Sequence, residues 1–131
     1  TTLFRSPEIM AYTGLTTRPL FVPSVGNFRQ GMIVSIPLHL TNLAGKPVAA
    51  DFEVALVKHY QGSEFVSVVP AEANGKLDAQ ALNDTNRLDI RVVANNKHGH
   101  AVLIARLDNL GKGASGAAVQ NLSLMLGLEL A

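Results

Sequence analysis

The sequence contains no cysteine and no tryptophan, and only 16% of its 131 residues are charged. Without cysteine the chain cannot form a disulfide, a thiolate metal site or a cysteine nucleophile. The net charge is only +1 and the basic residues are scattered singly, so no nucleic-acid-binding surface is indicated. No apolar run has the length of a membrane-spanning helix, and the first residues lack the layout of a secretion signal. We therefore expect a cytoplasmic protein that binds neither nucleic acid nor membrane.

Hydrophobic residues make up 47% of the sequence, enough for the core of one domain. Their spacing predicts alternating elements along the chain. In order, these are a short helix from Pro7 to about Tyr12 capped by Ser6, a strand over 32–40, a helix over 52–60, a strand over 64–69, a hairpin of 87–93 with 100–107, and a last helix over 115–126. This order indicates an α+β fold rather than a run of parallel βαβ units.

The segment Gly111–Gly116 (GKGASG) has the spacing of the dinucleotide fingerprint G-x-G-x-x-G and precedes a predicted helix. The fingerprint functions inside a βαβ unit, and no second strand follows it here, so a complete dinucleotide-binding unit is rejected. A Gly-rich helix start still leaves free backbone N–H groups to which a ligand could come close. A functional surface and a simple tight turn are equally consistent with this segment.

Two other groups of residues could carry chemistry. His98 and His100 could bind a metal, but a site needs three or four donors, so a metal-free hairpin turn is favoured. The loop 23–31 holds two glycines, Asn27, an aromatic residue and Arg29 between apolar segments. The guanidinium of Arg29 could bind a carboxylate or a phosphate, or could be solvated. No Ser-His-Asp arrangement or close carboxylate pair stands out.

Two stretches carry a family resemblance. Phe21–Val34 (FVPSVGNFRQGMIV) and Leu107–Leu122 (LDNLGKGASGAAVQNL) resemble the C-terminal half of N-acetyl-gamma-glutamyl-phosphate reductases, in the shorter of their two bacterial forms. The resemblance implies a mixed, largely antiparallel sheet with helices on one face, as in the second domain of aspartate-semialdehyde and glyceraldehyde-3-phosphate dehydrogenases. It also implies a C-terminal helix that returns to pack on a Rossmann domain.

Enzymes of this family use NADPH to reduce N-acetylglutamyl phosphate to its semialdehyde during arginine biosynthesis. The resemblance implies that residues 1–110 form an N-terminally incomplete substrate and dimerisation domain, and that residues 111–131 form the Gly-rich turn and returning helix. The Rossmann domain, the NADP site and the nucleophilic cysteine would then lie in a part absent from this chain. We expect a fragment that is inactive alone and that forms homo-oligomers.

The resemblance also suggests contact residues. Asn109, Lys112 and Gly113 match the family's cofactor side, where the asparagine approaches the nicotinamide carboxamide. Asn27 and Arg29 match the loop that lines the substrate side. The family's His-x-His-x-Pro-Glu segment reads Leu3-Phe4-Arg5-Ser6-Pro7-Glu8 here, with Arg5 at the position of the catalytic histidine. No catalytic residue and no metal ligand is therefore assigned.

A second hypothesis belongs to another class of protein. The chain could be a free-standing, non-catalytic interaction domain derived from such an enzyme. Arg5 in place of histidine favours this alternative, whereas the absence of an initial methionine and a last helix suited to an absent partner favour the enzyme fragment. A Gly-rich fingerprint and a cysteine encoded upstream would distinguish the two.

Overall fold

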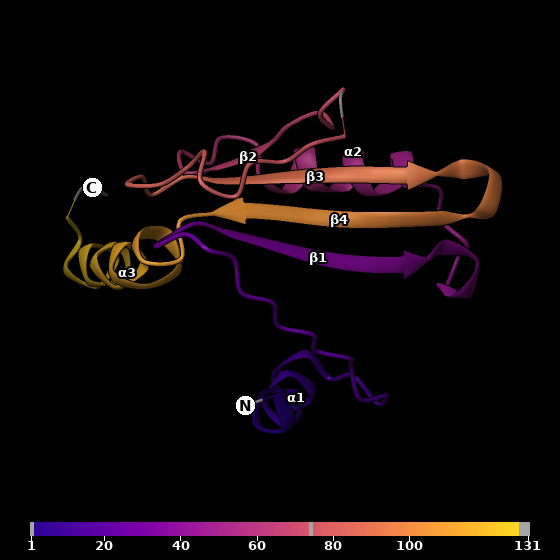
Figure 1. Ribbon diagram of the computed structural model, residues 1–131, viewed down its shortest axis with the longest axis horizontal. Coiled ribbons are helices and arrows are strands. Elements are labelled where there is room, and N and C mark those ends of the chain that lie inside the picture. The colour runs from indigo at the N-terminus through magenta and orange to yellow at the C-terminus, as the bar shows by residue number, and fades with distance from the viewer. Residues whose placement is uncertain (1, 74, 129–131) are drawn as a thin grey trace.

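The computed structural model describes residues 2–73 and 75–128, with side chains from residue 7 onward. Its helices and strands follow the predicted order (Figure 1). They are α1 (Thr2–Thr13), β1 (Met32–His39), α2 (Ala49–His59), β2 (Val66–Val68), β3 (Leu88–Asn95), β4 (His100–Leu107) and α3 (Gly116–Leu126). Short 3₁₀ turns occur at η1 (Leu40–Asn42) and η2 (Asn96–His98), and the π-helical turn η3 (Gly111–Ser115) leads into α3.

The four strands form one mixed sheet in the order β1-β4-β3-β2. Strands β3 and β4 are the predicted hairpin, and β1 pairs antiparallel with β4 along its whole length, from Met32 opposite Leu107 to His39 opposite His100. Only the short strand β2 runs parallel to its neighbour β3. The expected α+β fold with a mixed, largely antiparallel sheet is therefore confirmed.

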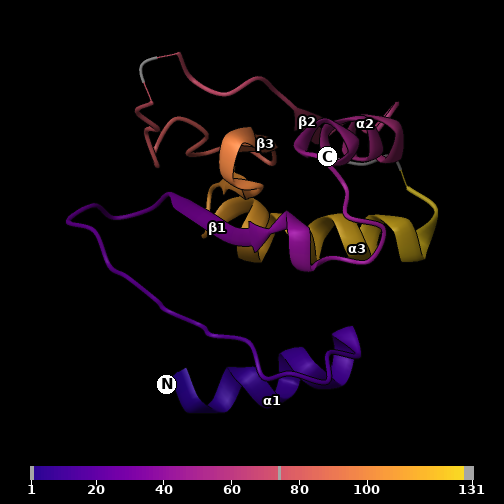
Figure 2. The ribbon, with the colours of Figure 1, turned by 90° about the vertical axis from the view of Figure 1, so that its right-hand side faces the viewer.

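One face of the sheet carries the apolar core. Leu40, Ala49 and Ala101 are buried there, and Phe52 of α2 and Val92 of β3 pack against them. Figure 2, viewed along the strands, shows α2 on one side of β3 and the long β2–β3 connection on the other. Because successive side chains of a strand point to opposite faces of the sheet, different residues of β3 face α2 and the β2–β3 connection.

The opposite face of the hairpin holds a buried charge cluster. Asp89 Oδ2 accepts hydrogen bonds from Arg106 Nη2 at 2.8 Å and from Arg91 Nη2 at 3.4 Å. The β2–β3 connection covers this cluster, since Arg106 Nη1 donates to the carbonyl of Asp78 and Arg91 forms an ion pair with Glu72. The alternation of polar and apolar residues in β3 thus reflects two covered faces and not one solvated face.

The first helix differs from its expected bounds. The sequence predicts a start at Pro7 with Ser6 as the cap, but α1 begins at Thr2 and contains Pro7 in its interior. The predicted start was wrong: the helix continues through Pro7, although the proline ring crowds the preceding turn and its missing N–H leaves one carbonyl without an intrahelical donor. Figures 1 and 2 show α1 set apart from the sheet, joined to β1 by an extended segment.

Candidate functional site

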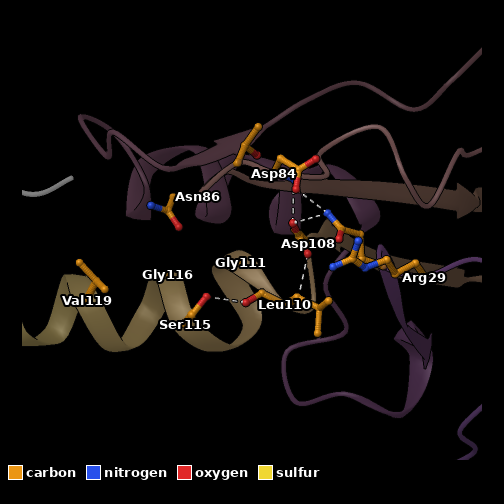
Figure 3. Close-up of a pocket in the computed structure, with 11 residues that line it drawn as sticks. Arg29, Asp84, Asn86, Asp108, Leu110, Gly111, Ser115, Gly116 and Val119 are labelled. Carbon is orange, nitrogen blue, oxygen red and sulfur yellow. Dashed lines mark hydrogen bonds between the residues drawn. The ribbon is translucent and has the colours of Figure 1, made fainter.

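Three segments that are distant in sequence meet at the C-terminal end of β4 and line an open pocket of about 530 Å³ (Figure 3). We call it the glycine-turn pocket. Its first wall is Arg29 and Gln30, which precede β1, and its second is the segment 84–86, which precedes β3. Its third wall comes from the turn after β4 and the start of α3, including Gly111, Ser115 and Gly116. Residues from three separate parts of the sequence therefore line one pocket.

The carboxylate of Asp108 lies at the base of this pocket and is 2% exposed. Its Oδ2 accepts hydrogen bonds from the Asp84 backbone N–H at 2.7 Å and from Gln30 Nε2 at 3.3 Å, and its Oδ1 accepts from the Leu110 N–H at 2.9 Å. Burial by itself raises the pKa of this carboxyl. Hydrogen bonds from the backbone of Leu110, Asp84 and Gly111 outweigh burial and lower the pKa of Asp108 below its ordinary value. Asp108 is therefore ionised at neutral pH and acts as an acceptor.

The third wall is the turn η3, which is wound as a π-helix. The N–H of Gly113 donates to the carbonyl of Asp108 at 2.8 Å, and the N–H of Ser115 donates to the carbonyl of Leu110 at 3.1 Å. A Cβ at Gly116 would overlap the side-chain oxygen of Asn86 and lie 2.9 Å from the carbonyl oxygen of Gly111. Glycine at position 116 thus allows α3 to lie close to the second wall. The last glycine of the G-x-G-x-x-G spacing therefore has a packing role in this fold.

Two hydrogen bonds hold the first wall in place, one from the side chain of Gln30 and one from the backbone N–H of the next residue, Gly31. The Gly31 N–H donates to Asn109 Oδ1 at 2.7 Å, and Gln30 Nε2 donates to Asp84 Oδ1 at 2.7 Å. Gly31 has a φ of +112°, and a Cβ there would lie 2.5 Å from the carbonyl oxygen of Ala79. The chain therefore enters β1 along a path that only glycine fits.

A second hollow, of about 540 Å³, lies beside the first and is lined by residues of the loop before β1 together with Ala79 and Asn109. Arg29 lines both hollows, and its residue as a whole is exposed. An exposed guanidinium between two hollows can pair with a carboxylate or phosphate in either of them.

Of the five site residues suggested by the sequence, Arg29 and Asn109 line the same hollow. The other three, Asn27, Lys112 and Gly113, do not line it. Asn27 is exposed on the loop and lines neither hollow. Lys112 Nζ donates to Gln120 Oε1 at 2.6 Å and lies 5.5 Å from the centre of the Phe65 ring. Gly113 is exposed within η3.

Sequence reasoning did not identify four polar residues of the pocket, namely Asp84, Thr85, Asn86 and Asp108. The only local signal was the position of Asp108, an acidic residue between the end of a predicted strand and a Gly-rich turn. Asp84 and Asn86 lie in the connection before β3, and their proximity to Asp108 depends on long-range folding.

Three of the histidines, His39, His98 and His100, lie at the other end of the sheet, away from the pocket. The His98 and His100 rings have centres 6.0 Å apart, and His39 lies opposite His100 with ring centres 4.8 Å apart. Among the residues that the structure describes, no group of three or more His, Cys, Asp or Glu side chains could hold a metal ion. Within the same residues, no helix is long and apolar enough to span a membrane.

Comparison with known proteins gives consistent matches over most of the chain. Residues 5–109 match the family model described as the semialdehyde dehydrogenase dimerisation domain. N-acetyl-gamma-glutamyl-phosphate reductase 2 of Pseudomonas putida is 50% identical over 124 residues, which is 92% of this chain and 40% of that protein. The N-acetyl-gamma-glutamyl-phosphate reductases of Brucella ovis and Brucella canis are each 49% identical over 124 residues, with the same two shares covered. The chain thus spans about 40% of the length of these relatives.

Proposed function

Because the chain belongs to the semialdehyde dehydrogenase dimerisation-domain family, we propose that it is the dimerisation and substrate-side part of an NADP-dependent N-acetyl-gamma-glutamyl-phosphate reductase. The observation that carries this proposal is the 50% identity to such a reductase over 92% of the chain. The complete protein would convert N-acetylglutamyl phosphate into the semialdehyde and release phosphate. It would work in the cytoplasm.

The reaction divides between this chain and the remainder of the protein. Covalent catalysis at an acyl phosphate requires a nucleophile, and the sequence contains no cysteine. The nucleophile is therefore assigned to the part outside this chain. The present residues bind and orient the substrate, with Arg29 pairing with the phosphate or carboxylate and Asn27 on the same loop.

The cofactor side is proposed at Asn109, Lys112 and Gly113. Asn109 Oδ1 accepts from the Gly31 N–H, so the amide nitrogen of Asn109 is the group available to donate to a carboxamide oxygen. Gly113 is exposed and has no side chain, so a flat ring could come close to the turn. The ammonium of Lys112 is engaged by Gln120, which fits a role in holding the turn against α3 better than a contact with cofactor phosphates. When bound, NADPH would supply the hydride.

The orientation of α3 supports the proposed division into residues 1–110 and 111–131. This helix buries its polar residues Gln120 and Ser123, whereas Val119, Leu122 and Met125 are 50%, 55% and 83% exposed. An exposed apolar stripe on a helix indicates a partner surface. We assign that surface to the Rossmann domain of the complete reductase.

An activity assay tests the proposed function. The complete protein should oxidise N-acetylglutamate semialdehyde with NADP in the presence of phosphate, and the 131-residue chain alone should show no turnover. A complete protein that forms homo-oligomers but has no reductase activity would instead establish the alternative, a non-catalytic interaction domain. Turnover by the chain alone would contradict the assignment of the nucleophile to the remainder of the protein.

Self-association tests the role of α3 separately. Without its partner surface, the chain alone should self-associate, because burying each large apolar side chain is worth roughly 1.5–3 kcal/mol. Replacing Leu122 and Met125 together by Lys should reduce the mass measured by light scattering across a concentration series. A double replacement of the exposed Glu53 and Lys58 of α2 by Ala serves as the control. A wild-type mass of one chain at every concentration would contradict the prediction.

A further inference from the structure

The first two walls of the glycine-turn pocket are joined directly by the hydrogen bond from Gln30 to Asp84, and a single side chain contacts all three walls. The carboxylate of Asp108 accepts from Gln30 in the first wall, from the backbone of Asp84 in the second and from the backbone of Leu110 in the third. The neighbouring residue Asn109 adds a bond to the Gly31 N–H. Two consecutive residues after β4 therefore contact all three segments at the place where they meet.

The chemistry of these contacts requires a negative charge. The groups that donate to the Asp108 carboxylate are all N–H groups: the backbone amides of Asp84, Leu110 and Gly111, and the side-chain amide of Gln30. An asparagine has almost the same shape, but its NH₂ group would face at least one of these donors, and the buried donor would lose its acceptor. The site is 2% exposed, so water cannot readily substitute.

We propose that Asp108 is the positioning residue of this pocket: its carboxylate holds the Arg29 side and the glycine turn at a fixed separation. This inference rests on the proposed function, in which Arg29 lies on the substrate side and the turn on the cofactor side. Asp108 touches neither ligand itself. It acts by coupling the two sides, so that loss of the charge displaces Arg29 and Asn109 together.

The first experiment examines the 131-residue chain and needs no activity. In NMR spectra recorded against pH, the amide protons of Asp84, Leu110 and Gly111 should shift together, with one midpoint below the ordinary carboxyl value of 3.8. At neutral pH, Asp108→Asn should accelerate amide hydrogen exchange at residues 29–31 and 110–113 by about tenfold or more. Separate midpoints for the three amides, or unchanged exchange at both segments, would overturn the proposal.

The second experiment measures kinetics in the complete reductase. Asp108→Asn should raise the KM for the semialdehyde and for NADP together, each by about tenfold, because both sides of the pocket lose their separation. The matched control is Asp51→Asn, which also removes a carboxylate that accepts a backbone N–H, from Val48 at 2.8 Å, but at the start of α2. This control should lower the melting temperature and leave both KM values unchanged.

The outcomes separate the two proposals. If both KM values of Asp108→Asn stay at wild-type levels, whatever its melting temperature, Asp108 is a structural residue only and the positioning role is refuted. If the wild-type protein has no reductase activity, the proposed function fails, while the NMR experiment still decides whether one carboxylate holds the three segments together.

Discussion

The two ends of β4 are held in place by different forces. At its N-terminal end, Ala101 is buried beside Leu40 and Ala49, and the contacts there are apolar. Just after its C-terminal end, next to the buried Leu107, the most deeply buried residue is a charged one, Asp108, whose contacts are hydrogen bonds from three separate segments. Apolar contacts tolerate exchange of one hydrophobic residue for another of similar volume, whereas a hydrogen-bonded carboxylate needs its charge. The comparison teaches that the sheet provides the scaffold and the polar end determines the pocket.

The largest effect on stability is expected at the apolar end. Leu40→Ala should lower the free energy of unfolding by about 3 kcal/mol, since it removes a nearly fully buried side chain and leaves a cavity. Urea denaturation measures the loss, and Leu124→Ala, at a side chain that is 64% exposed, is the control with little expected change. The amide shifts of residues 108–111 should remain those of the wild type. Shifts there would show that the two ends are not independent.

Acidification should affect the polar end selectively. The pKa of Asp108 is lowered by folding, so its contribution to stability is complete above the unfolded value and is lost as the pH falls through the folded value. Between neutral pH and that range, the wild type should lose more of its unfolding free energy than Asp108→Asn, which has no carboxylate to protonate at this position. Denaturation curves at a series of pH values test this. Parallel pH profiles for the two proteins would contradict the pKa direction.

A glycine substitution tests the close approach between two walls of the pocket. Gly116→Ala should cost about 1.5 kcal/mol, because the new Cβ meets the Asn86 side chain and the backbone oxygen of Gly111. Adding Asn86→Ala should restore part of the loss, since only the side-chain contact is relieved. Gly113→Ala is the matched control, with its nearest contact at 3.3 Å. Equal melting temperatures for Gly116→Ala and Gly113→Ala would refute the argument.

The smallest effect on stability is expected at Arg29, which is exposed. Arg29→Lys should change the unfolding free energy by less than about 0.5 kcal/mol. In the complete reductase it should nevertheless raise the KM for the acyl phosphate several-fold, because a planar fork of donors becomes a single ammonium. Lys97→Arg, at an exposed residue of the turn η2 at the other end of the sheet, serves as the control. Unchanged kinetics for Arg29→Lys would assign Arg29 to the solvated surface.

Local sequence patterns predicted the sheet well and the pocket poorly. The hairpin was predictable because alternation in β3 and β4 and the polar residues between them are short-range signals. The burial of Asp89, Arg91 and Arg106 could not be predicted in this way, since it depends on the β2–β3 connection folding across the hairpin. The burial of Asp108 also depends on distant residues, because Asp84 and Gln30, which donate hydrogen bonds to its carboxylate, lie 24 and 78 residues away in the sequence.

The Gly-rich segment shows how a correct pattern can have an unexpected use. Its spacing matches a dinucleotide fingerprint, and the sequence alone left open whether it was a functional surface or a tight turn. In the fold, Gly116 permits close contact between α3 and Asn86, and Gly111 lies under the Asp108 carboxylate. The glycines are explained by these neighbours, which no local window of the sequence contains.

The π-helical turn η3 also sets the rotational phase of everything that follows it. Each residue of an α-helix advances the side-chain direction by about 100°, and the hydrogen bonds of η3 span five residues, from Ser115 to Leu110 and from Gly113 to Asp108. One additional residue per turn therefore rotates α3 relative to a continuous α-helix. That rotation decides that Gln120 and Ser123 face inward and that Leu122 and Met125 face outward. The winding of the backbone in η3, immediately before α3, thus determines which side chains α3 exposes.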